Sequence, residues 1–152
     1  MRLQRALHGV TASAFYTLVD SEVTTTVSTS EQFQPGQPLL RRPKHSGNVF
    51  ASWQRGPAGL NAGIRFVGAR HDSSFLSMTT ATPVGGRVRT VDITVNPSYF
   101  VAMITGDWRV HRSLTLYALI DNLTDERYQS ALGFPGVPRS VSAGARFDGG
   151  RR

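Results

Sequence analysis

The feature that most constrains this sequence is an alternation of apolar and polar residues with a period of two. Blocks of about ten residues show the alternation, and stretches rich in Gly, Pro, Asp and Ser separate them. A period of two places successive side chains on opposite faces of a β-strand. Because no segment has convincing helical spacing, the sequence predicts an all-β fold.

The alternation predicts six strands, at residues 10–22, 44–55, 60–70, 87–110, 114–122 and about 139–147. In the second of these, Val49, Ala51 and Trp53 share one face, and Ser52 and Gln54 lie on the other. We therefore expect a six-stranded antiparallel up-and-down meander that forms a curved sheet, part of a transmembrane β-barrel.

Residues 87–110 fit one strand only with an irregularity. The apolar positions are odd in residues 91–95 and even in residues 100–108, and Asn96-Pro97 lies between the two sets. One inserted residue reverses the faces of a strand. We predict one long strand with a bulge at Pro97, and the alternative is a separate loop hairpin over residues 87–95.

The connections alternate in length, which indicates a membrane setting. Residues 23–43, 71–86 and 123–138 form long loops, whereas residues 55–59 and 111–113 form short turns. Outer-membrane barrels have short periplasmic turns and long external loops, and a soluble meander has no reason to keep that asymmetry. Charged residues make up 18% of the chain, below the roughly 25% of soluble domains.

The last third of the chain carries two motifs. Residues 122–128, Asn-Leu-Thr-Asp-Glu-Arg-Tyr, resemble the Asn-Leu-Phe-Asp-x-x-Tyr of TonB-dependent outer-membrane receptors, with Thr124 in place of Phe. Residues 133–139 resemble the Pro-Gly-Arg segment that follows in that family, although Val137-Pro138 interrupts it here. Upstream, residues 15–22, 43–45 and 65–68 resemble further family segments in the same order.

This resemblance implies that residues 1–147 are the last six strands of a 22-stranded barrel, followed by a disordered tail at 148–152. The family imports scarce nutrients such as iron–siderophore complexes or cobalamin, with energy that TonB transmits. The plug, the earlier strands and the TonB-binding segment would then be absent, and this chain would not transport alone. The parent protein would lie in the bacterial outer membrane, in contact with lipid and lipopolysaccharide.

The resemblance also implies roles for particular residues. The family motif is represented by Asn122, Leu123, Asp125, Tyr128 and Arg139. The barrel-assembly signal of a terminal strand is represented by Val141, Ala143, Ala145 and Phe147. The tail after Phe147 departs from that signal, because the aromatic residue is usually the last one.

Aromatic residues stand near the ends of the expected strands. A barrel in a membrane anchors itself with aromatic girdles at both interfaces, and the candidates are Trp53, Tyr99, Trp108 and Tyr128. The alternative for each is ordinary packing between strands, which aromatic residues also favour.

The net charge is +7, and Lys44 is the one lysine among 17 basic residues. Eight of the basic residues are expected at the external rim: Arg41, Arg42, Lys44, Arg70, Arg87, Arg89, Arg127 and Arg139. There they would pair with lipopolysaccharide phosphates or steer an anionic substrate, or they form a solvated loop surface. Arg65 and Arg146 are expected to face the lumen.

Nothing in the sequence indicates catalysis. The four histidines lack metal-ligand spacing, and His71-Asp72 is interpreted as loop polarity. There is no cysteine and no Gly-x-Ser-x-Gly motif. We expect no enzyme activity, cofactor or metal, and the sequence does not identify substrate-binding residues.

The main alternative is a stand-alone soluble β-domain that binds nucleic acid or another polyanion through its basic residues. A second is a small self-contained barrel, which needs eight strands. Residues 6–10 are too short for the apolar part of a signal peptide, so we expect the chain to begin inside a longer protein. The alternatives differ in whether Val49, Ile64 and Ile120 converge on a sealed core.

Overall fold

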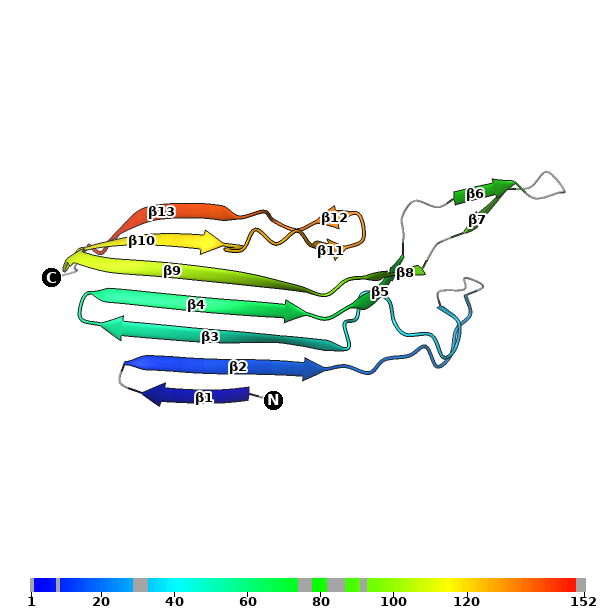
Figure 1. The fold of residues 1–152 in the computed structure, drawn as a ribbon, viewed down its shortest axis with the longest axis horizontal. Helices are drawn as coiled ribbons and strands as arrows, with labels where there is room; N and C mark the ends of the chain where they lie inside the picture. Colours follow the sequence, from blue (N-terminus) through cyan, green and yellow to red (C-terminus); the bar gives the residue numbers. More distant parts are fainter. Residues whose placement is uncertain are drawn as a thin grey trace.

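The computed structural model describes residues 2–7, 9–28, 33–73, 78–81, 87–90 and 93–149. Seven strands form one antiparallel sheet, in the order β1-β2-β3-β4-β9-β10-β13 (Figure 1). Their bounds are β1 (Arg2–Leu7), β2 (Val10–Leu18), β3 (His45–Arg55), β4 (Ala58–Val67), β9 (Tyr99–His111), β10 (Leu114–Asp121) and β13 (Ser140–Phe147). Three two-stranded hairpins lie at the long-loop end: β5 (Arg70–Ser73) with β8 (Ile93–Asn96), β6 (Met78–Ala81) with β7 (Arg87–Thr90), and β11 (Gln129–Ala131) with β12 (Phe134–Pro135).

The predicted all-β antiparallel architecture is confirmed, and each of the six expected ranges contributes a strand to the sheet, although only residues from Tyr99 onward do so in the range 87–110. The sheet gains a seventh strand, β1, which pairs with β2 from Arg2↔Phe15 to Leu7↔Val10. Gly9, with φ 81°, lies in the turn between them, a conformation that glycine adopts without steric cost. The sequence pattern of residues 2–7 was too irregular to reveal this strand.

The region after β4 corrects one prediction. Val67 pairs with Tyr99, and three positions further along both strands Arg70 pairs with Asn96. Equal spacing on both sides means that no residue is inserted, so the predicted bulge at Pro97 is wrong. Both strands are interrupted together instead, and residues 93–96 pair with β5 in a separate two-stranded sheet beyond the long-loop end of the main sheet (Figure 1). Pro97 cannot donate a ladder hydrogen bond, which accounts for the interruption on its side.

The strand register sorts side chains into two faces. One row of directly paired residues is wholly apolar: Ala12, Ala51, Ala62, Ile104, Ile120 and Val141. The adjacent row on the opposite face is mostly polar: Thr11, Ser52, Asn61, Thr105, Leu119 and Ser142. We call these the apolar face and the mixed face.

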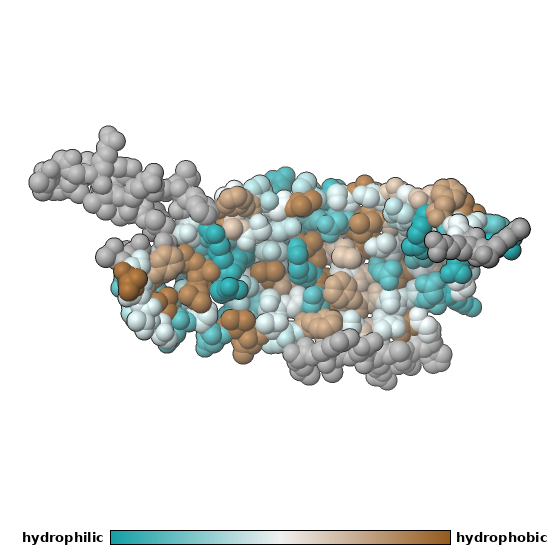
Figure 2. Space-filling model, turned by 180° about the vertical axis from the view of Figure 1, so that it is seen from behind, coloured by the Kyte–Doolittle hydropathy of each residue, from teal (hydrophilic) through white to brown (hydrophobic). Residues whose placement is uncertain are grey.

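No sealed core covers the apolar face. Among the described residues, the buried hydrophobic side chains are Tyr99 and Val101, whereas Val49 is 53% and Ile64 is 51% exposed. Ile120 is half-buried. Apolar side chains accordingly appear at the surface over the strands, interleaved with polar ones (Figure 2). The apolar groups therefore do not converge as they would in a soluble β-sandwich.

The outer strands β1 and β13 are not paired with each other in the described part of the chain, so the sheet is open. Asp148 still continues the last strand, because its amide donates to the carbonyl of Ser113 at 3.0 Å. The rest of the expected tail, 150–152, lies outside the described residues. No helix in the described ranges is long and apolar enough to cross a membrane.

Candidate functional site

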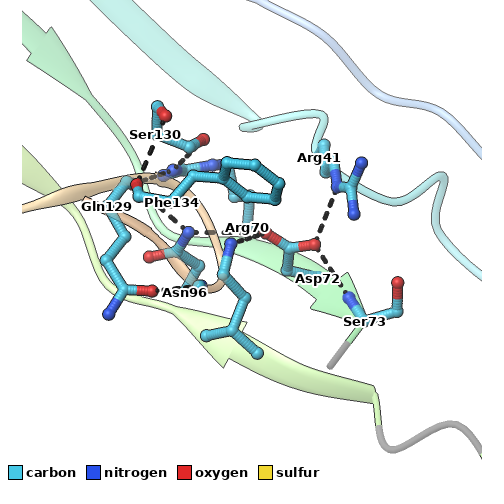
Figure 3. A network of polar contacts seen from close by, with 10 residues as sticks. Arg41, Arg70, Asp72, Ser73, Asn96, Gln129, Ser130 and Phe134 are labelled. Atoms are coloured by element: carbon cyan, nitrogen blue, oxygen red, sulfur yellow. Dashed lines mark hydrogen bonds and ion pairs between the residues drawn. The ribbon is translucent and has the colours of Figure 1, made fainter. Parts of the chain in front are cut away.

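A cluster of polar side chains joins three long connections at one end of the sheet (Figure 3). It comprises Arg41, Arg70, Asp72, Asn96 and the β11–β12 hairpin, and we call it the loop clasp. The side chain of Asp72 is fully buried at its centre. Its carboxylate accepts hydrogen bonds from Arg41 Nε at 2.8 Å, the Leu132 amide at 2.6 Å and the Ser73 amide at 2.8 Å. One carboxylate therefore ties residues from all three connections together.

The electrostatics of Asp72 follow from these partners. Burial by itself raises the pKa of a carboxyl group, because it disfavours the charged form. The hydrogen bonds from Arg41, Leu132 and Ser73 favour the carboxylate and outweigh burial, so the pKa of Asp72 is lowered from its ordinary value of 3.8. Asp72 is consequently ionised at neutral pH.

Arg70 makes a second connection in the loop clasp. Its side chain is almost wholly buried, and Nη2 donates to the carbonyls of Gln129 at 2.6 Å and Ser130 at 2.7 Å. The guanidinium lies over the Tyr99 ring, 5.5 Å from its centroid. Asn96 Nδ2 donates to the Gln129 carbonyl at 3.3 Å. Side chains of β5 and β8 thereby hold the β11–β12 hairpin by binding the backbone carbonyls of β11.

The motif residues at 122–139 form a second fastening, which we call the loop staple. Asn122 is buried, and its Nδ2 donates to the carbonyls of Glu126 and Val137, each at 2.9 Å. Its Oδ1 accepts from the Glu126 amide, and Asp125 Oδ1 accepts from the Arg139 amide at 3.0 Å. Asn122 and Asp125 have φ of 50° and 53°, a region that Asn and Asp tolerate better than most residues.

Tyr128 completes the loop staple. Its ring stacks on Tyr99 with centroids 4.3 Å apart, and a Cβ added at Gly136 would overlap the Tyr128 ring. The amide of Leu123 donates to the carbonyl of Ala102 at 2.8 Å, which anchors the start of the loop on β9. Within this loop the side chains of Asn122 and Asp125 bind backbone groups, Leu123 and Arg139 contribute their amides, and Tyr128 stacks on Tyr99.

The four girdle candidates separate into two pairs. Trp53 and Trp108 lie exposed on the apolar face near the short turns, where they pair with Leu60 and Leu116. Tyr99 is 7% exposed and stacks on Tyr128 at the opposite end of the sheet. The two tryptophans are thus exposed on one face and the two tyrosines stack on each other, and the girdle assignment of all four residues stays a prediction.

The basic residues are also divided. Arg41 and Arg70 belong to the loop clasp, and Lys44 pairs with Asp20 at 3.3 Å. Arg42, Arg127 and Arg139 are exposed at the long-loop end. The side chains of Arg87 and Arg89 lie outside the described residues.

The mixed face carries the two arginines expected in the lumen. Arg65 and Asp121 line a hollow of about 390 Å³ on this face, together with Phe50 and Met103. Arg146 lies opposite Thr115 at the short-turn end, and its Nε is 3.9 Å from Asp148.

The residues expected to form the assembly signal lie on β13. Val141 and Phe147 are 70% and 76% exposed, and the register places them on the apolar face with Ala143 and Ala145. Within the described ranges, no group of three or more His, Cys, Asp or Glu is arranged to hold a metal. Sequence reasoning missed the loop clasp, because Asp72, Asn96 and Gln129 approach one another only after the strands are paired.

Comparisons with known proteins agree with this geometry. The family model for the TonB dependent receptor-like β-barrel matches residues 4–123. No curated protein sequence matches the chain significantly. The fold is similar to that of the closed form of the ferric-catecholate import receptor Fiu of E. coli K12, with a TM-score of 0.70 and 20% identity.

Two further solved structures are similar. The siderophore receptor PiuA of Acinetobacter baumannii gives a TM-score of 0.71 at 19% identity. FpvA of P. aeruginosa, bound to heterologous pyoverdines, gives 0.66 at 14%. In all three comparisons 96% of this chain is covered, but only 20%, 21% and 19% of the solved chains respectively. The chain thus spans about a fifth of the length of the proteins whose fold it shares.

Proposed function

The chain belongs to the TonB-dependent receptor β-barrel family, and we propose that it forms part of the wall and external loops of an outer-membrane receptor for a scarce nutrient. An iron–siderophore complex is the favoured cargo, because the structurally similar proteins include a ferric-catecholate import receptor and a siderophore receptor. In this proposal the chain has a structural role and no catalytic one.

The observation that carries this proposal is the exposed apolar face. A row of apolar side chains crosses six neighbouring strands without a covering layer, and the opposite row is mostly polar. Contact with lipid hydrocarbon is favourable for such a face, provided that every backbone group is hydrogen-bonded within a closed barrel. Contact with water is unfavourable, because large exposed apolar patches promote association between molecules.

The remainder of the receptor would supply what this chain lacks. The open edges at β1 and β13 need neighbouring strands, and the solved relatives are about five times as long. We assign strand closure, the plug inside the barrel and the contact with TonB to that remainder. Outer-membrane lipid and lipopolysaccharide would contact the apolar face and the basic rim.

The soluble polyanion-binding alternative is not favoured. It requires the apolar side chains to share one core, and Val49 and Ile64 remain half exposed on a single-layer sheet. A self-contained barrel is not favoured either, since the two outermost strands do not pair in the described residues.

Cysteine labelling tests the membrane assignment, because the native chain has no cysteine. Single cysteines at Ile64 and Ile120 on the apolar face are compared with Asn61 and Thr105 on the mixed face. With this chain placed as the matching strands of a complete receptor barrel in lipid vesicles, we expect a water-soluble maleimide to label the second pair at once and the first pair only after denaturation, because maleimide reacts with the thiolate and hydrocarbon keeps a thiol protonated. Equal labelling of all four positions by the water-soluble reagent would contradict the proposal.

Uptake is tested with a chimeric receptor. Residues 4–147 replace the structurally matching strands of the E. coli ferric-catecholate receptor, and cells that lack their own receptor are grown under iron limitation. We expect the chimera to reach the outer membrane and to support growth on a ferric catecholate above the empty-vector level. A chimera that assembles in the outer membrane but does not support growth on the ferric catecholate would contradict the proposal that these strands belong to an iron–siderophore receptor.

A further inference from the structure

The main sheet and the β5–β8 hairpin separate at one level. The last pair of β4 and β9 is Val67 with Tyr99, and the first pair of β5 and β8 is Arg70 with Asn96. Two residues on each side lie between these pairs and belong to no strand. Figure 1 shows β5 and β8 beyond the ends of β4 and β9. Residues at the ends of elements can absorb the backbone rotation of a hinge, so the hairpin can bend here without disturbing the sheet.

We call residues 68–69 and 97–98 the paired break. Gly68 is anchored to β3, because its amide donates to the His45 carbonyl at 2.8 Å, and a Cβ at this position would lie 2.6 Å from the same oxygen. On the other strand, Pro97 has no amide hydrogen to donate. The paired break is therefore held at one point on the β4 side and lacks a donor on the β9 side.

The parts of the chain beyond the paired break are joined to one another (Figure 3). The backbone of the β11–β12 hairpin is bound by Arg70, Asp72 and Asn96. The third connection is bound through Arg41, whose amide donates to the His71 carbonyl at 2.7 Å. We call β5–β8, β11–β12 and Arg41 together the cap. Two of the three β11 residues and both β12 residues are exposed, so polar bonds rather than apolar burial hold this hairpin.

The polar bonds of the cap depend on one another. Loss of one connection leaves donors or acceptors of the remaining two desolvated and short of partners, which is unfavourable. Asp72 illustrates this, since its buried carboxylate would lack a donor after departure of either Arg41 or Leu132. Opening of a single connection is thus disfavoured relative to opening of all three together.

Arg70 links the cap to the main sheet across the paired break. Its guanidinium lies over the ring of Tyr99, the first residue of β9. Nη2 makes both bonds to β11, whereas Nη1 is buried and has no acceptor in the part of the chain that the structure describes. A buried donor without an acceptor opposes the closed arrangement, and contact with water on opening relieves that penalty.

We propose that the cap opens and closes as one cooperative unit about the paired break, while the main sheet stays folded. The interdependent bonds make the opening concerted, and the unpaired Nη1 of Arg70 lowers the free energy that opening requires. The inference goes beyond the proposed function, because it holds for any cargo. It gives the long-loop end one movable cap in place of three independent loops.

Hydrogen exchange tests the proposal in a receptor barrel that carries this chain as its matching strands, so that both edges of the sheet are paired. The amides of Arg41, Ser73 and Leu132 report on the three connections, because each is hydrogen-bonded inside the cap. We expect the three to share one opening free energy and to exchange on the order of 100-fold faster than the amides of the central strand β3. Three unequal opening free energies would overturn the cooperative unit, and protection equal to that of β3 would overturn separate opening.

A substitution in the main sheet tests whether the cap responds as a whole. Tyr99→Leu removes the ring under the Arg70 guanidinium and leaves the partners of Asp72 in place. It should accelerate exchange of the three amides by one common factor, about ten-fold. Phe100→Leu is the matched control, because the neighbouring ring packs on Phe66 instead, and it should leave the cap unchanged. Acceleration confined to the β11–β12 hairpin would refute concerted opening.

The position of the hinge is tested at the proline. Equal spacing on both sides allows the ladder to run through the paired break once a donor is available. Pro97→Val supplies that donor and should slow exchange of the cap amides about ten-fold. Pro57→Val, at the short turn between β3 and β4, should leave their exchange unchanged. Cap exchange that is the same in Pro97→Val as in the unmodified chain would overturn the role given to the paired break.

Discussion

The seven strands of the main sheet, which we call the wall, differ from the loop clasp in which side chains they bury. In the wall, backbone groups pair between strands while apolar side chains such as Val49 stay exposed on one face. In the loop clasp, the polar side chains of Arg70, Asp72 and Asn96 are buried, and Asp72 and Asn96 are among the least exposed in the described residues. The proposed membrane setting accounts for the difference, because a sheet in hydrocarbon would gain nothing from hiding its apolar residues, whereas loops in water need buried polar contacts to hold one shape. The following substitutions challenge that comparison.

The largest effect is expected from a charge on the apolar face. Val49→Arg should destabilise the inserted chain by about 3 kcal/mol, since an arginine near the middle of a barrel's lipid face carries a penalty of that size. The folded fraction of a receptor barrel that carries this chain as its matching strands, measured in lipid vesicles by a urea titration, reports the change. Ser52→Arg on the mixed face is the matched control and should cost less than 1 kcal/mol. Similar losses for both variants would mean that lipid does not contact this face.

The loop clasp should respond to a change that the wall tolerates. The carboxylate of Asp72 accepts hydrogen bonds from Arg41, Ser73 and Leu132. Asp72→Asn places an amide NH₂ donor beside these donors, which should lower the stability of the clasp by about 2 kcal/mol. We expect tryptic cleavage after Arg127, in the loop that the clasp holds, to accelerate about 30-fold. Asp20→Asn, at an exposed ion pair, should leave the rate within two-fold. An unchanged rate in Asp72→Asn would show that the clasp does not restrain this loop.

The loop staple should depend on one amide side chain. Asn122→Ala removes the two bonds donated to Glu126 and Val137 and places alanine at a φ of 50°, with a combined cost of roughly 2 kcal/mol. Hydrogen exchange of the Glu126 and Arg139 amides should quicken, while exchange in β3 and β4 stays constant. Asn61→Ala on the mixed face serves as the control. Faster exchange throughout the sheet would indicate that the staple and the wall are one cooperative unit.

Acid should loosen the loop clasp before the wall. The pKa of Asp72 is lowered in the folded chain, so its contribution to stability is complete above the ordinary value of 3.8 and is lost as the pH falls through the lowered one. Cleavage within residues 123–138 by pepsin should therefore rise steeply only below the ordinary carboxyl range. In Asp72→Asn this acid-dependent rise should be smaller. An identical pH profile for both proteins would remove Asp72 as its cause.

The smallest effect is expected at the exposed pair of Lys44 and Asp20. Lys44→Gln should change the free energy of unfolding by no more than about 0.5 kcal/mol, because exposed ion pairs contribute little. At low salt and again at high salt, the urea titration of Lys44→Gln should nearly superimpose on that of the unmodified protein. A loss above 1 kcal/mol would mean that Lys44 has a structural partner beyond Asp20.

Local pattern was sufficient for much of the wall. The alternation around Val49, Ile64 and Ile120 predicted their common face, and pairing through Ala51, Ala62 and Ile104 confirms it. Strand β1 escaped prediction because two arginines break the apolar period of residues 2–7. The prediction of a bulge at Pro97 was wrong. A shift of the apolar positions within one sequence can arise from an inserted residue or from an interruption of both partner strands, and the sequence alone does not distinguish the two.

The site was harder to predict than the wall. The motif from Asn122 to Arg139 was identified from the sequence. Its structural role depends on the φ of Asn122 and on the two carbonyls that the Asn122 side-chain amide binds, which the sequence does not show. Tyr99 was grouped with the tryptophans because it stands near a strand end. The structure shows that Tyr99 is 7% exposed and stacks on Tyr128, at the end of the sheet opposite the tryptophans.

By itself the sequence determined the strand period, the alternation of short and long connections and therefore the two unlike faces, because each of these is a property of neighbouring residues. The tertiary structure alone decided which loops meet: Arg41, Asp72 and Leu132 are brought together by strand pairing across 91 residues of chain from the first to the last of them. The physical reason is that a buried carboxylate needs several donors at once, and no single stretch of this chain supplies them.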